Sequence, residues 1–192
     1  MVILGIDPGF TSLGWALLDL SDAHPGPHCI GAGVIRTKPD NTIKRCDDNV
    51  RRIGILAGAL RKLQKENDCI LIAAEAQSWT SFQKPDRAVA MAWGIIGTIG
   101  EIWAIPVLQF RPQEIKKAIC NDASASKKTL ENALGASIGG AFEHLACISK
   151  TQRNHAADAL GAAVTSLDHD MVKMMENMRA YHIRRADGQA QQ

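Results

Sequence analysis

The sequence has no C-x-x-C spacing, and its cysteines are odd in number. A zinc knuckle needs closely spaced cysteine pairs, and a disulfide framework ordinarily uses an even number of cysteines. The cysteine pattern therefore argues against both kinds of site. We expect reduced thiols, mostly packed as small apolar side chains. They are Cys29, Cys46, Cys69, Cys120 and Cys147.

Long apolar runs are also missing. No stretch reaches the roughly 18 uninterrupted apolar residues of a membrane-spanning helix, because the nearest candidate, residues 88–105, contains Glu101 and several glycines. The N-terminus lacks the basic region that precedes the apolar run of a secretory signal. With average apolar and charged fractions, these absences predict a soluble globular protein in the cytoplasm, with no membrane partner.

The chain shows no internal repeat and no domain boundary. Its net charge of +2 does not by itself indicate a nucleic-acid partner, so local clusters carry more information. A chain of 192 residues is ordinarily one domain and is too short for two full α/β lobes. We predict a single domain over residues 1–168, then an extension over 169–192 that is helical at first and disordered from Ala186.

The change between strand and helix periodicity predicts an α/β fold. Three strands joined by short turns imply an antiparallel meander, and a fourth strand reached through a helix would lie parallel to the first. We therefore expect a central five-stranded mixed sheet, three antiparallel strands then two parallel, flanked by helices. Strands are predicted at 2–7, 13–20, 30–37, 69–74 and 106–110, helices at 41–67, 88–105, 112–119, 127–134, 151–167 and 171–185, and an ill-defined connection at 136–148.

Two of the predicted helices have further interpretations. The helix at 41–67 carries an apolar stripe, Ile43, Cys46, Val50, Ile53, Ala57 and Leu60, with basic residues including Arg51 and Arg52 on its other faces. We interpret the basic face as solvated surface in preference to a nucleic-acid site. The helix at 88–105 is apolar nearly all round, which fits either a core helix or a subunit interface.

Two carboxylates each stand at the end of a predicted buried strand. Asp7 precedes a Pro-Gly pair at the end of the first strand, and Glu75 follows the run 69–74. Uncompensated burial of a carboxylate is costly, so each must be paired, hydrogen-bonded or bound to a cation. A turn or capping role is the structural alternative for each.

The late helix at 151–167 adds His155 and Asp158, three residues apart and therefore on one face. If this helix crosses the ends of the two parallel strands, three acids and an imidazole converge. Such a group would repel itself unless divalent cations lay between its members. Oxygen-rich ligands suit Mg²⁺ or Mn²⁺, and two such ions are a common device for displacement at a phosphodiester.

The order of these elements resembles the RuvC-type Holliday junction resolvases of the RNase H-like superfamily. The resemblance covers about residues 1–167. The matching motifs are Leu4-Gly5-Ile6-Asp7-Pro8-Gly9, Ile35-Arg36-Thr37-Lys38, Ala74-Glu75 and His155-Ala156-Ala157-Asp158-Ala159-Leu160.

The resemblance implies an RNase H-like fold and a homodimeric, metal-dependent endodeoxyribonuclease. Such an enzyme cuts two strands of a four-way DNA junction symmetrically and leaves 5′-phosphate and 3′-hydroxyl ends. The implied metal ligands for two Mg²⁺ or Mn²⁺ ions are Asp7, Glu75, Asp158 and, where many relatives have Asp, His155. The implied catalytic lysines are Lys116 and Lys127, with Lys117 and Lys128 as adjacent alternatives.

One departure concerns junction opening. Relatives often carry an aromatic residue three positions after the strand-end Glu, where this sequence has Ser78. Trp79 or Phe82 could replace it by stacking on an unpaired base. The predicted DNA-binding residues are Arg36, Lys38, Trp79, Phe82, Lys84, Lys117 and Lys128; the sequence identifies no helicase partner.

The same residues also suggest three other functions. Gly5-Ile6-Asp7-x-Gly9 also looks like the first phosphate-binding hairpin of actin-like and sugar-kinase ATPases, but those folds need two lobes and the chain has no second such hairpin. A non-catalytic junction-binding protein is supported only by His155 at a usually acidic position. A closer alternative is an enzyme of the same fold with relaxed specificity for flaps, forks and other branched DNA.

Overall fold

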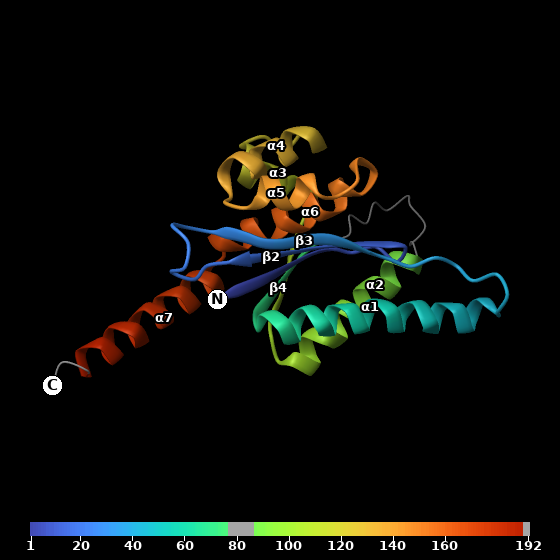
Figure 1. Ribbon diagram of the computed structural model, residues 1–192, viewed down its shortest axis with the longest axis horizontal. Coiled ribbons are helices and arrows are strands. Elements are labelled where there is room, and N and C mark those ends of the chain that lie inside the picture. The colour runs from blue at the N-terminus through green and yellow to red at the C-terminus, as the bar shows by residue number, and fades with distance from the viewer. Residues whose placement is uncertain (77–86, 190–192) are drawn as a thin grey trace.

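The computed structural model describes residues 1–76 and 87–189, and its centre is one five-stranded sheet (Figure 1). The strand order is β3-β2-β1-β4-β5. Pairs β1/β2 and β2/β3 are antiparallel, while β1/β4 and β4/β5 are parallel, which confirms the predicted sheet. The strands are β1 Val2–Asp7, β2 Ser12–Asp19, β3 His28–Arg36, β4 Cys69–Glu75 and β5 Val107–Phe110.

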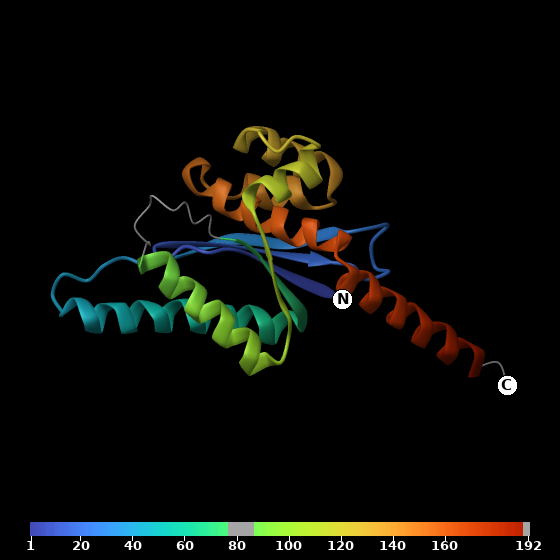
Figure 2. The same ribbon diagram turned by 180° about the vertical axis from the view of Figure 1, so that it is seen from behind.

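Helices cover both faces of this sheet (Figures 1 and 2). On one face lie α1 and α2; on the other α6 crosses the strands, with α3, α4 and α5 packed beyond it. After the short helix η1, α7 projects away from the rest of the molecule. The helices are α1 Arg45–Asn67, α2 Arg87–Trp103, α3 Pro112–Cys120, α4 Lys127–Ser137, α5 Ala141–Ala146, α6 Lys150–Thr165, η1 Ser166–Asp168 and α7 Asp170–Gln189.

Strand alternation sorts the buried side chains into two cores. Ile3 of β1 and Leu71 of β4 belong to the core under α6, whereas Leu4 and Ile72 belong to the core under α1 and α2. Successive side chains of a strand point to opposite faces, so the next odd-numbered residues of β1 and β4 also face α6. This parity decides where the strand-end carboxylates point.

Several predicted boundaries need correction. The connection expected at 136–148 contains α5, a helix too short for periodicity to reveal it. The helix α1 begins at Arg45 instead of residue 41. The helix predicted at 151–167 is α6, which ends at Thr165, and α7 follows as a separate helix that runs to Gln189. It includes residues 186–189, which were predicted to be disordered.

The face of α1 that packs on the sheet was also assigned wrongly. The residues that α1 buries are Asp48, Arg52, Leu56 and Leu60, so Arg52 does not lie on a solvated face. Most of the predicted apolar stripe is instead exposed or half-buried, and Val50 is 69% exposed. Arg52 was assigned to the solvated face because it is charged. Its four-residue spacing to Leu56 places it on the buried face instead.

None of the helices in the described part of the chain is long and apolar enough to cross a membrane.

Candidate active site

Asp7 and Glu75 lie side by side at one edge of the sheet. Both end their strands, and Ile6 of β1 is paired in parallel with Ala74 of β4, so the two carboxylates follow neighbouring positions. By strand parity Asp7 points to the same face as Ile3, and Glu75 to the same face as Leu71. Both therefore face α6, the helix that carries His155 and Asp158.

Two glycines bring α6 close to the strands. A Cβ placed on Gly5 would lie 2.1 Å from the carbonyl oxygen of Ala159, and one on Gly14 would lie 2.1 Å from that of His155. No side chain fits in either space, so the helix backbone packs directly on β1 and β2. This approach carries His155 and Asp158 to the strand ends.

His155 and Asp7, which are 148 residues apart in the chain, are in direct contact. The Nδ1 atom of His155 lies 2.6 Å from Oδ2 of Asp7. The hydrogen bond to Asp7, more than any other influence, raises the pKa of His155 above 6.5 even though partial burial lowers it. The imidazole is therefore the hydrogen-bond partner of the first carboxylate.

Lys127 neutralises part of the charge on Asp158. Its Nζ atom donates to Oδ2 of Asp158 at 2.8 Å. Lys127 is the first residue of α4, whose preceding residue, Ser126, accepts a hydrogen bond from the backbone N–H of Thr129 at 3.1 Å. Burial raises the pKa of Asp158 although Lys127 lowers it. Burial lowers the pKa of Lys127, but the bond and charge of Asp158 outweigh this and raise it overall.

Glu75 is partly buried and lies close to two other carboxylates. Burial, together with the charges of Asp158 and Asp7, raises its pKa to about 7, although Lys127 and Lys116 act in the opposite direction. Lys116 and Lys127 are thus the cations near the acids. The site thus brings three carboxylates and one imidazole together with two lysines.

This donor set fits a divalent cation. Three carboxylates and an imidazole offer oxygen and nitrogen ligands, and a bound cation would offset the charges of Asp158 and Asp7 that add to burial in raising the pKa of Glu75. Within the described residues, no three such side chains already stand in a metal-binding arrangement. Asp7 and Asp158 are instead bound to His155 and Lys127. The assignment of the four ligands stays a prediction.

The residues predicted to bind DNA are only partly assembled around this site. Arg36, the last residue of β3, and Lys38 are exposed on either side of Thr37. Trp79, Phe82 and Lys84 lie outside the described residues.

Sequence reasoning missed Gln152, which holds Arg36. With the Gln152 amide oriented so that its oxygen faces the guanidinium, it accepts from Arg36 Nε at 2.8 Å and from Nη1 at 3.1 Å. Gln152 lies one turn before His155 on α6, so this contact ties the end of β3 to the ligand-bearing helix. Within the sequence, only its three-residue spacing to His155 indicated that Gln152 lies on the same face of the helix as the predicted ligands.

The raised pKa values predict a pH-dependent stability for the metal-free protein. Glu75, His155 and Asp158 each bind protons more strongly when folded, so the stability they contribute is present below their unfolded pKa and lost as pH rises through the folded one. For Glu75 this window runs from 4.5 to about 7. We expect the melting temperature, measured by circular dichroism in a chelator, to fall by a few degrees across it.

The variant Glu75→Gln isolates this effect, since it removes the titrating group and should flatten the slope. The change Glu66→Gln, at an exposed residue near the end of α1, is the matched control and should keep the wild-type slope. Added Mn²⁺ should raise the melting temperature more above about pH 7 than below pH 5, because the ligands must be deprotonated. Equal slopes for wild type and Glu75→Gln would contradict the prediction.

A sequence profile of a known family, described as "Crossover junction endodeoxyribonuclease RuvC", matches residues 3–166. A protein of that name from Gloeobacter violaceus is 27% identical over 173 residues, covering 89% of this chain and 90% of the relative. Another, from Prochlorococcus marinus, is 30% identical over 165 residues, covering 86% of this chain and 97% of the relative.

The fold has a similar relative among solved structures. The RuvC of Thermus thermophilus, solved in complex with a Holliday junction substrate, superposes with a TM-score of 0.71 at 21% identity. The match covers 90% of this chain and 96% of that one. At this identity the likeness concerns the fold alone.

Proposed function

This chain belongs to the RuvC family of crossover junction endodeoxyribonucleases, and we propose that it resolves four-way (Holliday) DNA junctions by metal-dependent hydrolysis, with one nick in each of two symmetry-related strands. The observation that carries the proposal is the convergence of Asp7, Glu75, His155 and Asp158 at one end of the sheet, with Lys116 and Lys127 beside them. Acids flanked by cations suit a site that binds both metal ions and a phosphodiester.

The residues that would hold the metal are Asp7, Glu75, Asp158 and His155, and the ion would be Mg²⁺ or Mn²⁺. When bound, a pair of such ions supplies an activated water and stabilises the leaving 3′ oxygen. His155 contributes nitrogen where a carboxylate would contribute oxygen, which favours Mn²⁺ relative to an all-carboxylate site.

The lysines provide the positive charge for the DNA strand. Because its pKa is raised above 10.5, Lys127 is an ammonium at neutral pH. Its side chain is 57% exposed, so it can exchange Asp158 for a phosphate oxygen. With Lys116, it would hold the scissile phosphate and offset the charge that develops during hydrolysis.

We also propose that the enzyme is a homodimer that pairs through α1 and α2. An apolar groove between these helices is lined by Ile53, Ala57, Met91, Gly94, Ile95, Thr98, Ile99 and Ile102. Ile102 is 73% exposed, and a Cβ on Gly94 or Gly97 would meet nothing within 4 Å. Val50, an exposed residue of the apolar stripe predicted on α1, extends this apolar surface. The stripe, which we expected to be buried within the domain, therefore suits an intersubunit contact.

The dimer is tested by placing a charge in this groove. We expect Ile102→Asp to raise the dimer dissociation constant by roughly 100-fold, because a desolvated carboxylate would replace an apolar contact. Analytical ultracentrifugation over a concentration series measures it. The matched control is Phe142→Asp on α5, an equally exposed apolar residue on the other face of the sheet. A dimer equally stable in both variants would contradict the interface.

The function itself is tested with synthetic DNA. Wild-type protein with Mg²⁺ or Mn²⁺ should cut a four-way junction at symmetric positions in two strands, and a ligase should seal the products. Flaps and forks of the same sequence should be cut more slowly. Equal rates on all three would favour an enzyme of relaxed specificity, and junction binding without cleavage would favour a binding protein.

A further inference from the structure

Arg52 is a buried cation beside the turn of the β1–β2 hairpin, which carries Asp7. It is 7% exposed and lies on the face of α1 that also buries Leu56 and Leu60. Burying a guanidinium is costly unless its donors are satisfied. In the described part of the chain Arg52 makes no ion pair, because the nearby Asp48 binds Arg51 instead. Its charge is therefore met by neutral partners, which calls for an explanation.

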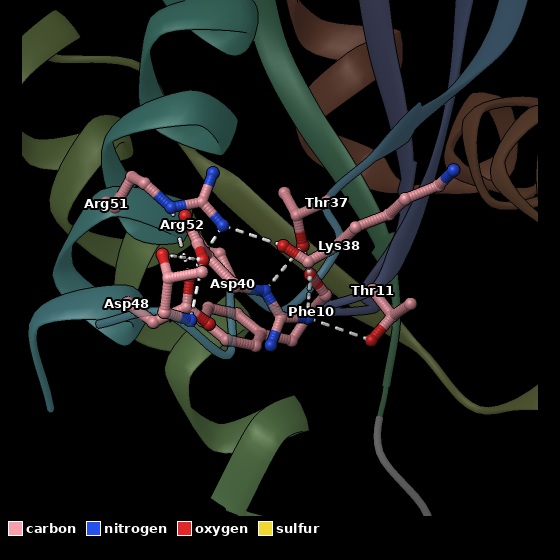
Figure 3. Close-up of polar contacts among 9 residues, drawn as sticks. Phe10, Thr11, Thr37, Lys38, Asp40, Asp48, Arg51 and Arg52 are labelled. Carbon is pink, nitrogen blue, oxygen red and sulfur yellow. Dashed lines mark hydrogen bonds and ion pairs between the residues drawn. The ribbon is translucent and has the colours of Figure 1, made fainter. Parts of the chain in front are cut away.

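Those partners come from two segments (Figure 3). From Arg52, Nε donates to Oγ1 of Thr37 at 2.9 Å, and Nη2 donates to Oγ1 of Thr11 at 2.9 Å and to the carbonyl oxygen of Phe10 at 3.4 Å. The guanidinium carbon also lies 4.2 Å from the centre of the Phe10 ring. One planar group thus holds the turn between β1 and β2 against the end of β3.

The two segments are also joined directly beside the guanidinium. Thr37 donates its hydroxyl to the carbonyl oxygen of Phe10 and its backbone N–H to the carbonyl oxygen of Thr11 at 3.0 Å. Arg51, the next residue of α1, donates to the carbonyl oxygen of Lys38 at 2.7 Å. The Lys38 ammonium points away from this network in Figure 3, and so stays available to bind DNA.

Each segment carries a part of the proposed machinery. Phe10 lies in the turn that follows β1, three residues after Asp7, the first proposed metal ligand. Thr37 lies between Arg36 and Lys38, the cations proposed to bind the DNA strand. We propose that Arg52 is a positioning residue that fixes the distance between these parts, so that the carboxylate and the cations act on the same strand. This proposal rests on the proposed function.

Only arginine has the geometry for this task. A guanidinium presents several N–H donors in a rigid plane, and can reach Thr11 and Thr37 together. A lysine in the same place keeps the charge, but it places one ammonium where two separated donors are needed. Arg52→Lys therefore separates the effect of the planar set of donors from the effect of the positive charge.

The test compares chemistry with binding. For Arg52→Lys, Thr11→Val and Thr37→Val we expect the single-turnover cleavage rate, at saturating enzyme and well below the melting temperature, to fall roughly 10- to 100-fold. Junction affinity, measured by fluorescence anisotropy in Ca²⁺, should change much less, because it sums many contacts. Thr37→Ser keeps the hydroxyl and should restore the rate. Arg61→Lys, on an exposed part of α1, is the matched control.

A merely structural role would give a different result. Variants that melt earlier but cut at the wild-type rate when folded would overturn the proposal, as would equal losses in rate and affinity. Hydrogen exchange in the DNA-free protein supplies a readout without cleavage: amides of residues 9–11 and 37–38 should exchange faster in Arg52→Lys, but not in Arg61→Lys. Faster exchange at both segments supports the linkage even if the wild type cuts no junction, and unchanged exchange overturns it.

Discussion

We expect Asp7→Asn to abolish cleavage of a four-way junction and to leave junction binding intact. The change keeps the shape of the side chain but removes the charge of a carboxylate that lies in contact with His155 and beside Glu75. Loss of one oriented charge-stabilising group costs about 10²- to 10³-fold in rate, and loss of a proposed metal ligand should cost at least about 10³-fold. Affinity should be unchanged or higher, because a negative charge near the phosphates is gone.

The measurements are single-turnover cleavage with Mn²⁺ and a gel-shift titration in Ca²⁺. Asp68→Asn is the matched control, since Asp68 is an exposed residue just before β4, at the opposite end of that strand from Glu75. Its left-handed backbone at φ 48° also accepts Asn. Cleavage retained by Asp7→Asn would refute the ligand assignment. Loss of binding together with cleavage would place Asp7 in the DNA interface instead.

Gly14→Ala should also disable the enzyme, through packing alone. The added methyl group would lie 2.1 Å from the carbonyl oxygen and 2.5 Å from the carbonyl carbon of His155, far inside van der Waals contact. The start of α6 must therefore move away from β2 and take His155 with it. A displacement of about 1 Å in a catalytic group can cost roughly 100-fold in rate. Overpacking should lower the free energy of unfolding by about 1–3 kcal/mol.

Gly58→Ala makes the same chemical change where there is room. A Cβ at Gly58 meets nothing within 4 Å on the exposed side of α1. Alanine is favoured over glycine inside a helix by about 1 kcal/mol, so this variant should be at least as stable as the wild type and cut normally. Urea unfolding and single-turnover cleavage separate the two. A Gly14→Ala enzyme that cuts normally would mean that the position of His155 is not critical.

Local patterns predicted the elements and their order well. The apolar run that ends at Asp7 became β1, the run before Glu75 became β4, and the three-residue spacing of His155 and Asp158 put both on one face of α6. These predictions succeeded because strand and helix periodicities are properties of neighbouring residues. The short helix α5 escaped because its six residues are too few to define a period.

Contacts between distant segments could not be predicted in the same way. Lys127 and Asp158 are 31 residues apart, and nothing near either one shows that they meet. Which of Lys127 and Lys128 contacts Asp158 depends on how the first turn of α4 is oriented toward α6. Arg52 was misread because a charged residue on a buried helix face is uncommon, and its neutral partners, Thr11 and Thr37, come from two other segments.

The sequence by itself determined the α/β architecture, the acids at the strand ends and the family to which the chain belongs, because each depends on residue type and local spacing. Tertiary structure decided which side chains of that site meet. The close packing of α6 on Gly5 and Gly14 brings His155 to Asp7, and the orientation of α1 buries Arg52 behind the same hairpin. Such distances depend on how whole elements pack, which local spacing does not encode.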